Sequence, residues 1–228
     1  MKLTFFGHSA FQLEVAGAVV QIDPFITGNP LASAHVSADD LAADAILLTH
    51  AHGDHFGDTP SIAARTGALV VANFEITQYM GQRHGHENVQ PLNTGGGADL
   101  PWGRVTNTWA RHSSSFPDGS YGGNPGGFMI EAEGKCLYIA GDTSPFAEMA
   151  WIGETHDIDV AVLPIGDVFT MGQEGSVRAA SMLNASLVVP CHYDTFPPIE
   201  TDTDAWSERM RRAGQTPHVL APGQSLDV

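Results

Sequence analysis

The chain has 228 residues, 43% of them hydrophobic, so it is long enough to bury a core as one domain over residues 1–228. Its 10 Lys and Arg residues against 26 Asp and Glu residues give a formal net charge of −16, which argues against a surface that binds nucleic acid. Without an apolar run of membrane-spanning length, a secretory signal or a disulfide framework, it is expected to be cytoplasmic, with a small-molecule partner and no membrane contact.

The first third of the chain is predicted to be a β-meander, after which strands and helices alternate. The strands expected in the first half are 2–6, 11–15, 18–22, 45–48, 68–72 and 88–92. A helix capped by Asp58 or Thr59, with Pro60 in its first position, is expected after the fourth strand, and another at 74–83.

The second half is predicted to follow the same plan. Its expected strands are 104–111, 127–133, 135–140, 158–163, 186–190 and 218–220. Its expected helices begin at Pro145 and occupy 173–183 and 203–213, and the Gly-rich segments 94–97 and 119–127 are expected to be loops. A meander followed by βα units thus occurs twice, in residues 1–100 and 101–228. This repetition predicts an α+β fold, a four-layer αββα sandwich with two mixed β-sheets packed face to face and helices outside.

The most specific pattern in the chain is His50-Ala51-His52-Gly53-Asp54-His55, which directly follows the predicted strand 45–48. It places four metal-ligand residue types within six positions, where a buried strand gives way to a loop. A loop can turn several side chains toward one point, which a regular helix or strand cannot. Imidazole suits zinc and neighbouring transition metals, and a carboxylate adds a harder donor.

Three further ligand candidates also follow predicted strands: His112, Asp142 and His192. Binding groups in α/β sheets usually lie at the ends of strands, so these residues are expected near the histidine motif. Together the candidates comprise five histidines and two aspartates, which are enough to hold two metal ions.

In their order along the chain, these residues resemble the motifs of the metallo-β-lactamase superfamily: Asp23, the His50–His55 motif, His112, Asp142 and His192. Other stretches resemble one branch of it, the small metal-dependent hydrolases related to ascorbate-6-phosphate lactonase: Gly7-His8-Ser9, residues 22–30, residues 169–172 and residues 192–197. The resemblance covers essentially the whole chain and implies the αββα fold.

The resemblance also implies a ligand set for two divalent metal ions. One ion would be held by His50, His52 and His112, the other by Asp54, His55 and His192, with Asp142 between the two. Asp23 would lie behind the motif as a hydrogen-bond partner of a ligand histidine. Zinc is the expected metal, and manganese or iron also fits a set made of His and Asp alone.

Two such ions roughly 3.5–4 Å apart can share a water and lower its pKa toward about 7, which supplies a hydroxide. The chain is therefore expected to be a metal-dependent hydrolase of a small, anionic ester, lactone or phosphodiester, with Asp54 and His8 as catalytic residues. Related di-iron proteins that reduce oxygen resemble this pattern but have Glu where His52 stands, so His52 favours hydrolysis. Two other functions remain open: a nuclease of the tRNA-processing type, and a metal-loaded ligand sensor without turnover.

Several residues have two interpretations at this stage. His8 is either a substrate binder and proton donor or only a hydrogen-bond partner of the loop. Asp167 is either an acid/base group or a turn residue. Four apolar side chains either form a rim beside the metals or are packing residues: Phe169, Met171, Tyr193 and Phe196. Cys191 is expected to be a buried thiol, and an apolar helix at 146–152 leaves formation of a homo-oligomer open.

Overall fold

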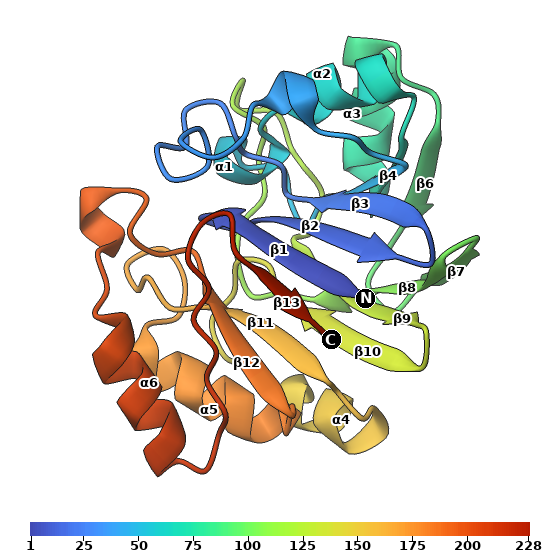
Figure 1. Ribbon diagram of the computed structural model, residues 1–228. Coiled ribbons are helices and arrows are strands. Elements are labelled where there is room, and N and C mark those ends of the chain that lie inside the picture. Colours follow the sequence, from blue (N-terminus) through green and yellow to red (C-terminus); the bar gives the residue numbers. More distant parts are fainter.

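Two mixed β-sheets organise the chain, and the computed structural model describes all of residues 1–228 (Figure 1). The first sheet has the order β13-β1-β2-β3-β4-β5-β6, with β1 (Lys2–Gly7), β2 (Ala10–Val15), β3 (Ala18–Ile22), β4 (Ala45–Leu47), β5 (Leu69–Asn73), β6 (Val89–Leu92) and β13 (Ser225–Asp227). The second sheet has the order β12-β11-β10-β9-β8-β7, with β7 (Gly97–Leu100), β8 (Gly103–Trp109), β9 (Gly126–Ala132), β10 (Lys135–Ile139), β11 (Val160–Pro164) and β12 (Leu187–Cys191).

Each sheet combines an antiparallel meander with parallel strands that are joined by helical crossovers. Strands β1, β2 and β3 pair antiparallel, and β3 to β6 pair parallel. In the second sheet β7 to β10 pair antiparallel, and β10 to β12 pair parallel. The two halves therefore repeat one plan, as the order of predicted elements indicated.

Helices cover the outer faces of both sheets (Figure 1). The helices on the side of the first sheet are α1 (Gly53–Phe56), α2 (Thr59–Thr66) and α3 (Phe74–His84), with a 3₁₀ turn η1 (Ala38–Asp40). Those on the side of the second sheet are α4 (Glu148–Thr155), α5 (Gln173–Leu183) and α6 (Thr203–Arg212), with η2 (Pro197–Ile199). This confirms the predicted sandwich of two mixed sheets with helices outside. No helix is long and apolar enough to cross a membrane.

Strand alternation assigns the side chains of the first sheet to two apolar layers. On β4 and β5, Leu47 and Val71 belong to the larger cluster of 41 buried residues, which includes the facing strands of the second sheet. Ile46 and Val70 point the opposite way, into a cluster of 18 buried residues with helices α2 and α3. Because both faces of these strands are covered, they contain continuous apolar runs rather than alternating polar ones.

Two helix starts differ from the predicted ones. Helix α2 begins at Thr59 with Pro60 in its second position, and Asp58 occupies the N-cap position without capping. Instead, Asp58 Oδ2 accepts hydrogen bonds from the backbone nitrogens of residues 26 and 27, both at 2.8 Å. Helix α4 begins at Glu148, because irregular turns follow Pro145 before regular helix starts.

The predicted strand at 218–220 is wrong. The last strand is β13, at the edge of the first sheet beside β1, where it pairs Lys2 with Asp227 and brings the two termini close together. The segment near residues 218–220 makes only one isolated bridge, between Val188 and Pro217. Strand β7 was also missed, because it has only four residues and begins at Gly97, inside the segment 94–97 that was predicted to be a loop.

Replacing Leu47 with Ala should destabilise the sandwich strongly, because its side chain is fully buried between the two sheets. We expect a loss of about 2–5 kcal/mol in the free energy of unfolding, measured in urea with a chelator present so that metal binding does not contribute. Leu100→Ala on the partly buried edge strand β7 is the matched control. An equal or larger loss in the control would contradict the assignment of the central layer.

Candidate metal centre

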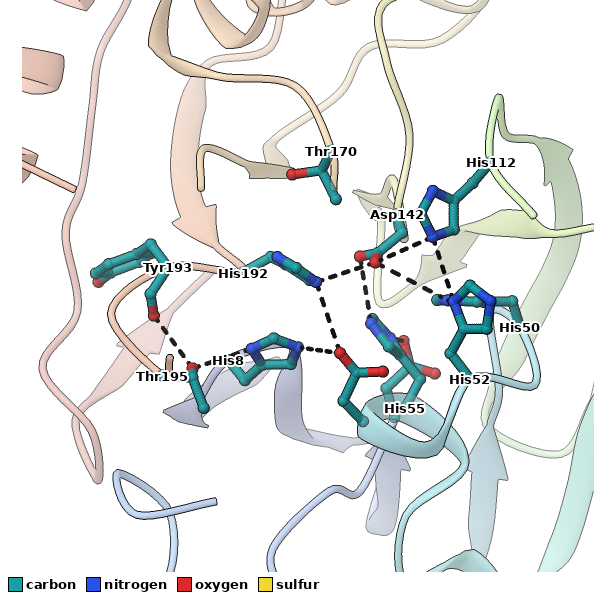
Figure 2. A network of polar contacts seen from close by, with 12 residues as sticks. His8, His50, His52, His55, His112, Asp142, Thr170, His192, Tyr193 and Thr195 are labelled. Atoms are coloured by element: carbon teal, nitrogen blue, oxygen red, sulfur yellow. Dashed lines mark hydrogen bonds and ion pairs between the residues drawn. The ribbon is translucent and has the colours of Figure 1, made fainter. Parts of the chain in front are cut away.

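The predicted ligand residues converge where strands of both sheets end (Figure 2). The first sheet contributes the His50–His55 motif, which follows β4 and includes the short helix α1. The second sheet contributes His112, Asp142 and His192, which follow β8, β10 and β12. The structure thus brings all seven predicted ligand residues together, from positions up to 142 residues apart (192 − 50).

Three histidines form one half of the centre: His50, His52 and His112. His52 Nδ1 lies 3.0 Å from His50 Nε2 and 3.3 Å from His112 Nε2. Their ligand atoms all lie within 4.8 Å of one another, which allows one cation to touch all three. His50 is buried, whereas His52 and His112 are partly exposed.

Asp142 faces both halves of the centre. Its Oδ2 lies 3.5 Å from His112 Nε2 and 3.9 Å from His50 Nε2, on one side. On the other side, Oδ2 is 3.0 Å from His192 Nε2 and Oδ1 is 3.3 Å from His55 Nε2. A carboxylate in this position could contact a cation held by either group of histidines.

Asp23 supports the motif from behind, in a buried position after β3. Its Oδ1 accepts from the backbone nitrogen of Thr49 (2.9 Å), and its Oδ2 accepts from Thr49 Oγ1 (2.6 Å) and His55 Nδ1 (2.7 Å). Because the Thr49 hydroxyl donates to Asp23, it must accept the contact from His50 Nδ1 at 3.1 Å. The protons of His50 and His55 therefore lie on Nδ1, and Nε2 of each ring is directed at the centre.

The donor atoms fit a cation. Neither His55 Nε2 nor Asp142 Oδ1 has a hydrogen-bond partner, although both are buried and lie 3.3 Å apart. Unpaired buried polar atoms are costly, and a cation between them would satisfy both. The set of imidazoles and carboxylates suits zinc and also manganese or iron.

Without a cation, the acidic neighbours favour a second proton on His55, at Nε2, in addition to the one on Nδ1. Burial acts to lower the pKa of His55, but the charges of Asp142 and Asp23 outweigh it and raise this pKa well above the usual range. The other half behaves differently. Burial lowers the pKa of His50 and of His112, so both rings are neutral at neutral pH and ready to bind a cation.

Asp54 lies at the mouth of the centre, with 31% of its side chain exposed. Its Oδ2 is 3.0 Å from His8 Nε2 and 3.9 Å from His192 Nε2. Burial acts to raise the pKa of Asp54, but the hydrogen bond from His8 and the charge of His55 hold it below the usual carboxyl range. Burial lowers the pKa of His8 to about 4, against the opposing effect of Asp54.

Three residues of the centre have left-handed backbone conformations that non-glycine residues rarely adopt. The φ angles are 59° for His8, 45° for Asp23 and 54° for His192, and each residue follows the end of a strand. Such conformations cost on the order of 1–3 kcal/mol each and persist where surrounding contacts enforce them. They aim these side chains across the ends of the sheets instead of along them.

The residues that had two interpretations differ in their burial and contacts. Met171 and Tyr193 are buried in the large core cluster, whereas Phe169 is 54% exposed. Phe196 packs against the His8 ring, with 5.6 Å between ring centroids. Asp167 is exposed in a turn with a positive φ of 57°.

Two other expectations concern packing. Cys191 is a buried free thiol. The apolar segment 146–152 is divided: Phe146 and Met149 are buried, but Trp151 is 67% exposed.

Two hydroxyl groups that contact histidines of the centre were not predicted from the sequence. Thr49 immediately precedes the motif, and Thr195 lies 3.0 Å from His8 Nδ1. Thr49 falls between the predicted strand 45–48 and the motif, and Thr195 lies within the stretch 192–197. The hydroxyls nevertheless gain their roles only from residues distant in the sequence, so the local pattern did not reveal them.

Comparison with known proteins relates the whole chain to metal-dependent hydrolases. Residues 2–192 match the family described as Beta-lactamase superfamily domain. The UPF0173 metal-dependent hydrolase of Salinibacter ruber is 48% identical over 227 residues, 99% of each chain. The UPF0173 metal-dependent hydrolase ABC2731 of Shouchella clausii is 49% identical over 233 residues, 100% of each chain. The solved structure of Igni18, a metallo hydrolase from Ignicoccus hospitalis, superimposes with a TM-score of 0.89 at 40% identity and covers 99% of this chain and 97% of its own.

Metal binding should release the proton that His55 holds, and this release should depend on Asp23. The raised pKa of His55 means that the ring is protonated at pH 7 without metal, so protons compete with metal even above neutral pH. We expect zinc affinity to keep rising with pH above 7. In Asp23→Asn, which lacks one of the two charges that raise this pKa, fewer protons should be released at pH 7 and affinity should fall about 10- to 100-fold.

The measurements are zinc titrations against a chromophoric chelator between pH 6 and 9, and proton release in weakly buffered solution. Asp44→Asn is the matched control, because Asp44 also accepts a backbone hydrogen bond, from Val19, but lies outside the centre. Equal proton release from the wild type and Asp23→Asn would contradict the role given to Asp23.

Proposed function

The chain belongs to the family described as Beta-lactamase superfamily domain and is a metal-dependent hydrolase, and from this membership we propose that it cleaves a small anionic ester, lactone or phosphodiester with two divalent metal ions. The observation that carries the proposal is the position of Asp142, whose oxygens face ligand histidines of both halves. A single cation could not use all seven side chains, whereas two cations could.

The ligand roles follow the two halves of the centre. One ion would be held by the cluster of His50, His52 and His112. The other would be held by Asp54, His55 and His192, which cluster together with His8, and Asp142, which clusters with His50 and His55, would contact both ions. Two such ions, when bound, lower the pKa of a shared water toward about 7 and thereby supply hydroxide at neutral pH. Zinc is the proposed metal, with manganese or iron as the alternatives.

The protein residues direct where the substrate meets this water. His52, Asp54 and His112 are partly exposed, whereas His50 and His55 are fully buried, so a substrate would reach the centre beside the three partly exposed residues. Asp54 stands at this opening, where its carboxylate can orient the attacking water. His8 acts through Asp54, because its buried ring contacts that carboxylate.

Charge supports a small anionic substrate. Two divalent ions bring four positive charges against the three negative charges of Asp23, Asp54 and Asp142, which leaves the centre cationic, before its water ionises, in an acidic protein. The main group of cations, on α6, is small and partly neutralised: Arg209 pairs with Glu174 and Arg212 with Glu208, which leaves Arg211 without an acidic partner. We therefore favour a metabolite over RNA as the substrate.

The proposal is tested by metal analysis together with a panel of phosphodiester, aryl ester and lactone substrates, on the zinc and manganese forms. We expect two ions per chain and turnover of at least one substrate class. Asp142→Asn should lower kcat/KM by at least about 100-fold, because it weakens the carboxylate that serves both halves. Asp159→Asn, which removes a half-exposed contact with Lys135, is the control and should keep wild-type activity.

Each alternative has its own signature in these measurements. Two bound ions without turnover of any substrate would favour a metal-loaded ligand sensor. Tight binding of RNA at physiological salt would favour a nuclease of the tRNA-processing type. One ion per chain in an active enzyme would contradict the dinuclear centre.

A further inference from the structure

The loop that follows His112 binds the backbone of the histidine motif. The backbone nitrogen of Ala51, which stands between His50 and His52, donates a hydrogen bond to Ser114 Oγ at 3.2 Å. Ala51 is fully buried and Ser114 is buried beside it, so bulk water does not serve this N–H. A buried backbone N–H needs a partner, and here the partner is the hydroxyl of Ser114.

Backbone groups fix the direction of both hydrogen bonds of the Ser114 hydroxyl. A backbone N–H only donates, so the Ser114 oxygen accepts from Ala51. A carbonyl oxygen only accepts, so the hydroxyl proton goes to the Gly122 carbonyl oxygen, which lies 2.9 Å away. The backbone nitrogen of Gly122 donates in return to the Ser114 carbonyl oxygen at 3.1 Å. None of these bonds depends on the protonation state of a titratable group.

Asn73 attaches the same loop to the first sheet. This residue ends β5 and caps α3, because its Oδ1 accepts from the backbone nitrogen of Ile76 at 2.9 Å. Its Nδ2 donates to the carbonyl oxygens of Gly122, at 2.7 Å, and Asn124, at 2.9 Å. The loop is therefore held in place by an element that contributes no ligand candidate to the centre.

The loop and the motif are packed without free space between them. A Cβ atom at position 122 would collide with Ala51 Cβ and would lie 2.7 Å from Ser114 Oγ. Without the Ser114 hydroxyl, the Ala51 N–H would lose its partner, and the peptide between His50 and Ala51 could rotate to find another. Such a rotation would move the two histidines that flank Ala51.

We propose that Ser114 is a positioning residue for the ion that His50, His52 and His112 would hold. It lies two residues after His112 and binds the backbone between His50 and His52, so one hydroxyl sets the spacing of all three rings. Ser114 makes no hydrogen bond to the ligand candidates of the other half, which should respond much less to its loss. The inference rests on the proposed function only in that these three histidines are taken as the ligands of one ion.

The test measures metal binding by the full chain and needs no substrate. Zinc affinity is measured against a chromophoric chelator, and cadmium NMR shows each bound ion as its own signal. The signal of the three-histidine site is identified by its loss in His52→Ala. Groups that support a metal ligand typically contribute about 10- to 100-fold in affinity, so we expect Ser114→Ala to weaken this site by that factor. Its cadmium signal should shift or disappear, while the signal of the other ion stays.

Two further changes separate the hydroxyl from the shape of the side chain. Ser114→Thr and Ser114→Val add the same bulk, but only the first retains a hydroxyl, so it should bind zinc at the three-histidine site at least about 10-fold more tightly than the second. Asn73→Asp keeps an acceptor that can cap α3 but removes the N–H donors that hold the loop. This variant should weaken the same site.

Two serines serve as controls. Ser115→Ala changes an exposed serine of the same loop and should leave both zinc affinities at the wild-type values. Ser176→Ala changes a buried serine of α5 that accepts a hydrogen bond from Trp206 Nε1 at 3.3 Å. It measures the general effect of losing a buried hydroxyl and should not act on one ion selectively.

Unchanged zinc affinity in Ser114→Ala would overturn the inference, and so would an equal loss at both sites or equal affinities of Ser114→Thr and Ser114→Val. Failure of the proposed function has a different signature. A wild type that hydrolyses no substrate, but whose three-histidine site still responds selectively to Ser114→Ala, would contradict the proposed hydrolysis and support the positioning role.

Discussion

The buried carboxylate of Asp23 is the group on which the rest of the centre depends. It accepts three hydrogen bonds, from the backbone and hydroxyl of Thr49 and from His55 Nδ1, and thereby holds the start and the end of the histidine motif. Through Thr49 it also sets the proton of His50. One side chain that touches no substrate thus directs the free nitrogens of two histidines, one in each half of the centre, toward the same space.

The candidate metal centre also requires that the two sheets meet where the histidine motif begins, and the sandwich fold provides this. The Thr49 carbonyl oxygen accepts a hydrogen bond from the backbone of Gly126, which opens β9. Gly141, with a φ of 62°, lies so close that a Cβ atom there would be 2.5 Å from the Gly126 carbonyl oxygen and 2.9 Å from Thr49 Cβ. A side chain at position 141 would therefore push Asp142 away from the first sheet. The packing between the two sheets therefore also sets the distance between Asp142 and the histidine motif.

Sequence reasoning predicted most strands, the layered fold and the candidate ligands because these depend on local periodicity and on the order of motifs. It failed where the decisive contact is distant: β13 is a strand only because it pairs with β1 at the other end of the chain. The same limit applies to Thr195, whose contact with His8 spans 187 residues. An abundant residue such as threonine has no motif of its own, so only coordinates can give it a role.

The carboxylates beside two histidines of the centre separate the roles of their rings. Thr49 donates to the Asp23 carboxylate and therefore accepts from His50, which leaves the His50 nitrogen nearest the centre free to bind a cation. His8 instead faces the Asp54 carboxylate, which only accepts, so His8 presents an N–H toward the centre. An N–H suits a carboxylate and not a cation. A carboxylate behind the ring thus makes His50 a ligand candidate, and a carboxylate in front of the ring makes His8 a support.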